Sequence, residues 1–311
     1  MTDIVSGDGL EQDISKWLSP PDPWKNYHIA CDSRHRGSAS WFIQGTTFSE
    51  WKASEAPTSS LWIHGKRPLM PSFYAFSEAK ILLFSAGAGK SVFWYIKYLV
   101  SLSRKLIMLA SSTIIENLDA MRKTGLASLA FFFCDFREDQ KKDLRGLLSS
   151  LLVQLGHQSD FYCDIIFKFY SEHAKGLRHP SDDALVGCLK DLLKLPGLPP
   201  VYLIVDALDE CPNTSAIPSP RAKVLTFLED LIESQIPNLR ICVTSRVETD
   251  IEDILDPLIL HSVSLHDQSE QKRDIEEYIK SVINTHSISR RWKANHRQLV
   301  IDVLTEKADG M

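Results

Sequence analysis

The sequence predicts an α/β domain built on a mainly parallel five-stranded sheet flanked by helices, followed by the start of a C-terminal helical subdomain. Two observations carry this prediction. Short apolar runs typical of buried parallel strands recur along the chain, and amphipathic stretches with helical spacing separate them. Strands that alternate with helices favour a parallel sheet covered on both faces.

The predicted strands are rich in aliphatic and aromatic residues. They cover residues 61–64, 130–136, 201–205, 239–244 and 261–265. The run Val-Tyr-Leu-Ile-Val at 201–205 contains no charged residue, as expected for a strand buried on both faces.

The predicted helices show apolar residues at intervals of three and four. They cover residues 13–18, 144–155, 221–234, 271–284 and 296–307. The first of these ends at the Pro-rich stretch 19–23, which breaks a helix.

We divide the chain into three parts. Residues 1–59 are a lead-in of short helix and loops, residues 60–266 form the core domain, and residues 267–311 start the helical subdomain. The chain stops directly after a predicted helix, so we expect it to be truncated.

Composition excludes several classes of protein. The 311 residues are 44% hydrophobic and 24% charged with a net charge of −5, which is typical of a soluble globular protein and argues against a nucleic-acid partner. The six cysteines form no C-x-x-C pair, and the N-terminus carries no secretory signal, so we expect a cytoplasmic protein with free thiols. Lysines and an arginine interrupt the apolar stretch at 92–115, which argues against a membrane span.

A phosphate-binding loop is the first motif that carries chemistry. Its residues are Ala86, Gly87, Ala88, Gly89, Lys90 and Ser91. In such a loop backbone N–H groups surround the β-phosphate, the lysine reaches the β and γ oxygens, and the serine hydroxyl ligates Mg²⁺. The full pattern, G-x-x-x-x-G-K-[ST], needs a glycine where this chain has Phe84.

An acidic cluster follows the strand at 201–205 and supplies the second half of a nucleotide site. Asp206, at the strand's carboxyl end, is predicted to hold Mg²⁺ together with Ser91. Asp209 and Glu210 are predicted to position or activate the attacking water. A solvated acidic turn after an ordinary strand is the alternative, and the phosphate loop upstream argues against it.

The strand at 239–244 is followed by Ser245 and Arg246. An arginine at the carboxyl end of such a strand can face the γ-phosphate of a bound nucleotide. A surface arginine at a strand end is the alternative, which we would favour without the other two motifs.

Together these motifs resemble the NACHT class of signal-transducing (STAND) P-loop NTPases. The resemblance is to fungal NACHT proteins with a nephrocystin-like N-terminal module, which include heterokaryon-incompatibility and NLR-like proteins. The matching segments are residues 14–23, 37–42, 48–51, 205–212, 237–246 and 306–311.

Two stretches, residues 67–85 and 94–110, do not match the family. Removing residues 67–85 restores the complete phosphate-loop pattern with Gly65 as its first glycine. We interpret both stretches as retained introns in the gene model. A genuine insertion is the alternative, with residues 81–84 serving as the first strand.

The resemblance implies a switch that binds ATP or GTP with Mg²⁺, hydrolyses it slowly if the site is intact, and couples nucleotide state to self-association. A different class of function is a nucleotide-dead interaction scaffold, or a non-functional product of a mis-spliced or truncated gene model. The choice between adenine and guanine follows from no motif in this sequence.

Overall fold

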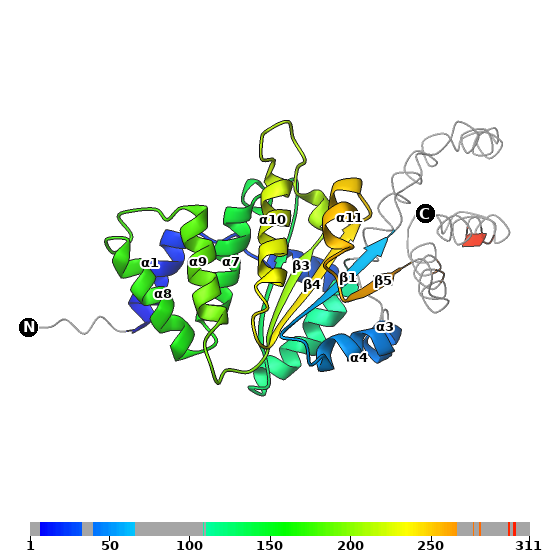
Figure 1. Cartoon of the computed structure of the whole chain (residues 1–311), viewed down its shortest axis with the longest axis horizontal. Coiled ribbons are helices and arrows are strands. Elements are labelled where there is room, and N and C mark those ends of the chain that lie inside the picture. Colours follow the sequence, from blue (N-terminus) through cyan, green and yellow to red (C-terminus); the bar gives the residue numbers. More distant parts are fainter. Residues whose placement is uncertain are drawn as a thin grey trace, which may run out of the picture.

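The computed structural model describes residues 7–32, 40–65 and 110–265, together with the isolated positions 108, 276, 280, 298, 301 and 302. Its centre is a sheet of five parallel strands in the order β2-β3-β4-β1-β5 (Figure 1). The strands are β1 (Thr58–Gly65), β2 (Ser128–Phe133), β3 (Val201–Asp206), β4 (Leu239–Arg246) and β5 (His261–Ser264). Each overlaps one predicted strand, which confirms the predicted α/β fold with a parallel sheet.

Helices surround the sheet. Those before β1 are α1 (Gly7–Leu18), α2 (Trp24–Asp32), α3 (Ser40–Gln44) and α4 (Thr46–Ala53), and residues 110–123 are helical before β2. Those after β2 are α7 (Leu144–Gly156), α8 (Asp160–Glu172), α9 (Asp182–Leu193), α10 (Pro220–Glu233) and α11 (Thr249–Leu255). Two 3₁₀ turns, η1 (Asp139–Lys141) and η2 (Leu208–Glu210), follow β2 and β3. Among the described helices, none combines the length and the apolar composition needed to cross a bilayer.

Four of these helices begin at a residue that caps them. The side chains of Asp143, Ser159, Ser181 and Ser219 each accept a hydrogen bond from a backbone N–H in the first turn of α7, α8, α9 and α10. Such caps satisfy donors that have no partner inside the helix, so they fix where each helix starts.

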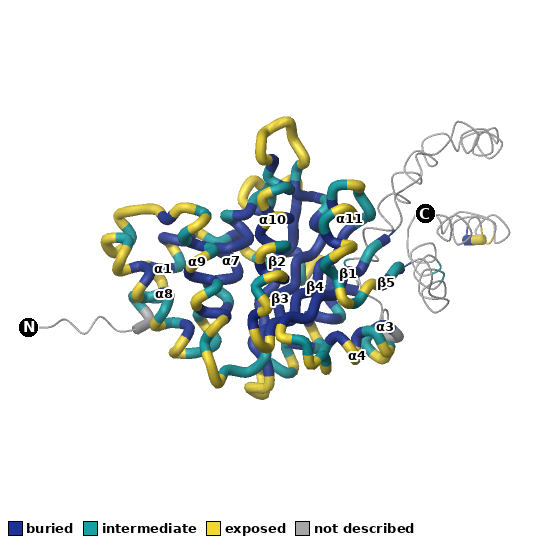
Figure 2. Tube along the Cα trace, viewed as in Figure 1, coloured by how far each residue is buried: buried dark blue, intermediate teal, exposed yellow. Residues whose placement is uncertain are grey.

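Apolar side chains cover both faces of the sheet, because successive residues of a strand point to opposite sides. On β1, Trp62 packs into the cluster formed with α1 and α7 to α11, whereas Leu61 and Ile63 pack with α4 and residues 110–123. Strands β2, β3 and β4 alternate in the same way, whereas in the edge strand β5 only Val263 is buried. Figure 2 shows β3 and β4 at the buried centre of the molecule. The continuous apolar runs seen in the sequence follow from this two-sided burial.

The described helices that connect neighbouring strands to the rest of the sheet lie on opposite faces. Between β1 and β2, the helix at residues 110–123 lies on the α4 side, and β2 is at the edge of the sheet. Between β4 and β5, α11 lies on the other side. Right-handed crossovers require this, because the two connections run in opposite directions along the sheet. The carboxyl ends of β1 and β4 therefore form a topological switch point, where ligands bind in open α/β sheets.

The exposed side of edge strand β2 is closed by two glutamines of α7. Gln158 accepts a hydrogen bond from the Leu129 N–H (2.9 Å) and donates one to the Leu129 carbonyl (2.6 Å). Gln154 does the same for Phe131, at 3.1 Å and 2.8 Å. The two side-chain amides thus take the place of a further strand and satisfy backbone groups that would otherwise invite pairing with another chain.

The lead-in packs against the body of the domain. In α1, Trp17 donates a hydrogen bond from Nε1 to the Arg178 carbonyl (2.9 Å), and its ring meets Phe169 of α8 at a tilt and Tyr170 of α8 edge-on. In α2, the ring of Trp24 meets Phe131 of β2 edge-on, with centroids 4.9 Å apart. The described part of the lead-in is thus packed structure rather than a loose connection.

Candidate functional site

The candidate site lies at the carboxyl edge of the sheet, where β3, β4 and β1 end side by side. Adjacent strands are about 4.8 Å apart, so the ends of β1 and β3 are separated by about 10 Å, with β4 between them. Asp206 ends β3, and Gly65 of β1 is in register with Arg246 of β4. This edge therefore brings together three of the residues that the sequence predicts.

Asp206 is buried, and Thr244 on the neighbouring strand fixes its orientation. The Thr244 hydroxyl donates a hydrogen bond to Oδ1 of Asp206 (2.6 Å) and accepts one from the Ala207 N–H (3.0 Å). Asp206 is 1% exposed and Thr244 is fully buried. One hydroxyl thus holds both the carboxylate and the first residue of the turn that follows β3.

That turn reverses the chain immediately after Asp206. Ala207 has φ of 55° and ψ of 46°, the left-handed conformation that an alanine adopts only at a cost of about 1 kcal/mol. Its carbonyl then accepts a hydrogen bond from the Glu210 N–H at 2.8 Å. The strained residue brings Asp209 and Glu210 back toward the end of β4.

Asp209 holds Arg246. The Arg246 backbone N–H donates to Oδ1 of Asp209 (3.0 Å) and its Nε donates to Oδ2 (2.6 Å). The Asp209 side chain is 7% exposed and that of Arg246 is 33% exposed. Burial disfavours the charged guanidinium, but the Asp209 carboxylate outweighs this and raises the pKa of Arg246. Asp209 and Arg246, predicted separately from the sequence, thus form one unit.

A second aspartate and arginine pair stands at the end of β2. Asp135 accepts hydrogen bonds from the Arg137 backbone N–H (3.0 Å), Nε (2.8 Å) and Nη2 (2.6 Å). Burial opposes ionisation of Asp135, but these bonds lower its pKa to about 2. The pair repeats the arrangement at the end of β4, in which one carboxylate binds both the backbone N–H and Nε of an arginine.

Two buried thiols connect the ends of β2 and β3. Sγ of Cys134 lies 3.4 Å from Sγ of Cys211, and the Cys134 N–H donates to the Asp206 carbonyl at 2.9 Å. The hydrogen bond with Cys211 and burial together raise the pKa of Cys134 well above its ordinary value. The segments that carry Arg137 and Glu210 are therefore packed against each other.

Gly65 ends β1 and is the first glycine of the predicted phosphate loop when residues 67–85 are removed. Its carbonyl accepts a hydrogen bond from the Val247 N–H at 3.2 Å, so the last residue of β1 is bound to the first residue after β4. The loop residues Ala86 to Ser91, Phe84, and the stretch 67–85 lie outside the described residues, as does 94–110 apart from positions 108 and 110. The helices predicted at 271–284 and 296–307 also lie outside them, except for isolated positions.

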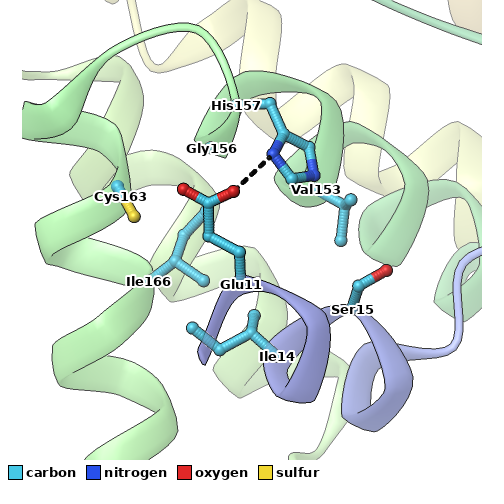
Figure 3. A pocket seen from close by; sticks show the side chains of 8 residues that line it. All are labelled: Glu11, Ile14, Ser15, Val153, Gly156, His157, Cys163 and Ile166. Carbon is cyan, nitrogen blue, oxygen red and sulfur yellow. Dashed lines mark ion pairs between the residues drawn. The ribbon is translucent and has the colours of Figure 1, made fainter. Parts of the chain in front are cut away.

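A small pocket away from the candidate site is lined in part by helix α1 of the lead-in (Figure 3). It lies between α1, α7 and α8, and its lining shares no residue with the candidate site. Glu11 and His157 face each other across it, with Oε2 and Nδ1 3.3 Å apart. The pocket marks where α1 seats on α7.

The sequence reasoning missed Thr244, Asp135 and Arg137. Thr244 could have been found as a hydroxyl side chain near the end of a mainly apolar strand, two residues before the predicted Arg246. Asp135 and Arg137 carried a weaker signal, because an acidic residue after a strand is common and nothing in the sequence shows that it binds the arginine two residues later.

Comparison with known proteins bears on part of the chain. A search of curated proteins finds no match. Residues 108–246 match the family model described as Nephrocystin 3, N-terminal. The matched segment runs from the helix before β2 to the end of β4, so it contains Asp206, Asp209, Glu210 and Arg246 but not Gly65. Over these residues the chain is therefore similar to the nephrocystin 3 N-terminal family.

Proposed function

We propose that this chain is the nucleotide-binding switch core of a NACHT-type, NLR-like STAND protein, which binds ATP or GTP with Mg²⁺ in the cytoplasm. The observation that carries the proposal is the buried Asp206 carboxylate, oriented by Thr244 at the carboxyl end of β3 and close to the switch point between β1 and β4. A carboxylate oxygen is the kind of ligand that Mg²⁺ prefers, so the residues at this edge fit the ion.

The residues that we assign to phosphate binding begin at the end of β1. Gly65 ends β1 at the switch point, and the phosphate loop that we assign to Ala86–Ser91 would then receive the phosphates beside β4. In this assignment Lys90 contacts the β and γ oxygens, and Ser91 and Asp206 hold the metal. When bound, Mg²⁺ neutralises charge on the β and γ phosphates.

The remaining residues act on the terminal phosphate. Glu210 orients the water that attacks the γ phosphorus, and the bond to the bridging oxygen breaks to release nucleoside diphosphate and phosphate. Arg246 faces the terminal phosphate with the guanidinium nitrogens that Asp209 leaves free, since Asp209 binds only its Nε and backbone N–H. Asp209 is thus a positioning residue, a more specific role than water activation.

The output of the proposed switch is a change in self-association rather than a product. Hydrolysis is slow in such proteins, so the nucleotide state sets the populations of two conformations.

Equilibrium binding of fluorescent ATP and GTP tests the proposal. The wild-type chain, Lys90→Ala and a version lacking residues 67–85 and 94–110 are compared in the presence of Mg²⁺. Lys168→Ala is the matched control, because that lysine is 79% exposed and lies on α8, away from the site. We expect Lys90→Ala to abolish binding and Lys168→Ala to leave it unchanged.

The outcomes separate the two functions considered for this chain. Binding only by the shortened version would support the interpretation of the two stretches as retained introns. Absence of binding by both versions would overturn the proposal and leave the nucleotide-dead scaffold. Glu210→Gln adds a test of the chemistry, since it should retain binding and slow hydrolysis, and equal hydrolysis rates would contradict the role of Glu210.

A further inference from the structure

Arg221, near the start of α10, binds the turn that carries Asp209 and Glu210. Its Nη2 donates a hydrogen bond to the Asp209 carbonyl (2.6 Å), and its Nε donates one to the Cys211 carbonyl (2.9 Å). These two carbonyls belong to the residues on either side of Glu210. The backbone N–H of Arg221 donates to the next carbonyl, that of Pro212, at 3.2 Å. One residue of α10 thus holds the backbone along the whole second half of the turn.

The guanidinium of Arg221 is itself fixed by α11. Its Nη1 donates hydrogen bonds of 3.3 Å to both carboxylate oxygens of Asp250, which lies in the first turn of that helix. Helices α10 and α11 lie next to each other against the same face of the sheet (Figure 1). Arg221 is 9% exposed, and each of its three guanidinium nitrogens has an acceptor, so the rigid planar group has one orientation.

The turn depends on such contacts because its first residue is strained. Ala207 has the left-handed conformation, which persists only where the surrounding structure holds it. At the start of the turn the Thr244 hydroxyl binds the Ala207 N–H, and at its end Arg221 binds the two carbonyls that flank Glu210. Glu210 is itself 7% exposed. The backbone of Glu210 therefore cannot shift without breaking hydrogen bonds to Arg221.

We propose that Arg221 is a positioning residue of the candidate site, which fixes the backbone on both sides of Glu210 and so sets the place of its carboxylate. This inference rests on the proposed function, in which Glu210 orients the attacking water. Arg221 also holds the backbone of Asp209, whose carboxylate binds Arg246. It thus acts through the residues that face the terminal phosphate and makes no contact with the nucleotide.

Single-turnover hydrolysis and diphosphate affinity test the inference in the version of the chain that binds nucleotide. Arg221→Met keeps a long apolar side chain but removes the guanidinium. We expect the rate of ATP or GTP hydrolysis to fall about tenfold or more, because a small displacement of a reacting group slows chemistry strongly. The dissociation constant of ADP or GDP should change less than twofold, since a diphosphate lacks the phosphate that Glu210 and Arg246 face. Arg221→Lys keeps the charge but reaches fewer acceptors, so its rate should lie between those of wild type and Arg221→Met.

Arg240→Met is the matched control. Arg240 is 6% exposed and also binds backbone carbonyls, namely those of Ser54, Ala56 and Pro57, at 2.5–3.4 Å. It lies at the amino end of β4, at the opposite edge of the sheet from the candidate site. Its replacement removes a comparable set of buried hydrogen bonds and should lower the midpoint of thermal unfolding without changing the rate. Thermal unfolding of every variant verifies that each is folded, and Arg221→Lys serves if Arg221→Met is not.

Each remaining outcome overturns a defined proposal. An unchanged rate in folded Arg221→Met would overturn the inference and leave the proposed function intact. Equal losses of rate and diphosphate affinity, an equal loss of rate in Arg240→Met, or unfolding of both Arg221 variants would show a general structural role and would also overturn the inference. A wild-type chain that binds nucleotide without hydrolysing it would remove the hydrolytic role of Glu210 and this inference with it, whereas absence of binding would overturn the proposed function itself.

Discussion

Replacing Asn26 by leucine should destabilise the domain by about 3 kcal/mol, because Asn26 binds a buried cation. Lys141 in η1 is 1% exposed, and its ammonium donates hydrogen bonds to the Asn26 side-chain oxygen and to Glu138 Oε2 (3.2 Å). A hydrogen bond to a charged group contributes about 1.5–3 kcal/mol. Removing a partner of a buried charge costs about 3–5 kcal/mol, and the remaining Glu138 bond keeps the loss near the lower limit.

Urea unfolding at neutral pH measures this change. An exposed asparagine provides the control: Asn213 donates a hydrogen bond to Asp250 at the surface (2.9 Å), so Asn213→Leu should change the free energy of unfolding by less than about 0.5 kcal/mol. The double variant Asn26→Leu/Lys141→Met removes the buried charge together with its acceptor and should recover most of the loss. A change below about 0.5 kcal/mol in Asn26→Leu would refute the idea that α2 is bound to the domain through Lys141.

Three further predictions concern the edge of the sheet and the candidate site. The double variant Gln154→Leu/Gln158→Leu removes four hydrogen bonds to β2, so it should lower the free energy of unfolding by about 2–4 kcal/mol and promote self-association, which light scattering detects. A variant that stays monomeric with wild-type stability would contradict the role of the two glutamines in closing this edge. Folding depresses the pKa of Asp135 from 3.8 to about 2, so the ionised carboxylate stabilises the fold fully above about pH 4, and this contribution disappears as the pH falls toward 2. The difference in unfolding free energy between wild type and Asp135→Asn should therefore narrow between about pH 4 and about pH 2. A constant difference would contradict the ion pair of Asp135 with Arg137. Thr244→Val should leave the fold intact at 25 °C but weaken Mg²⁺-dependent nucleotide binding about tenfold, since it frees the carboxylate at the end of β3; unaltered binding in a titration would show that the hydroxyl does not orient it.

Strands β2 and β3 could be predicted from the sequence because all of their residues are buried. Their apolar residues therefore form nearly continuous runs, which show in the sequence where these strands lie. The prediction placed residues 134–136 in the second strand, whereas β2 ends at Phe133. The reason is that its partner β3 ends at Asp206, and the chain turns so that Asp135 binds Arg137.

The docking of the lead-in could not be predicted, because it depends on partners far away in the sequence. Trp17 donates to a carbonyl 161 residues further along the chain, and Asn26 binds Lys141, 115 residues away. No local periodicity encodes such contacts, and the Pro-rich stretch 19–23 gives this region the look of a linker.

The sequence indicated the residues of the candidate site one by one, but it did not show which of them contact each other. Acidic residues after a buried strand and an arginine after the next one are visible in the sequence. That Asp209 binds Arg246 depends on the left-handed turn at Ala207, a conformation that an alanine rarely adopts and that the sequence does not reveal. In the function that we propose, this contact leaves Glu210, rather than Asp209, to act on water.

The Mg²⁺ dependence of nucleotide affinity tests the central claim most directly, namely that Asp206 at the end of β3 holds the metal of a bound nucleotide. Isothermal titration of ATP and of GTP, with Mg²⁺ and with EDTA, compares the wild-type chain with Asp206→Asn, which preserves the shape and the acceptor for Thr244. Asp139→Asn is the control, since that side chain is 95% exposed. We predict that Mg²⁺ strengthens binding at least tenfold in the wild type and in the control, and has no effect in Asp206→Asn. An equal effect of Mg²⁺ in wild type and Asp206→Asn would contradict the account.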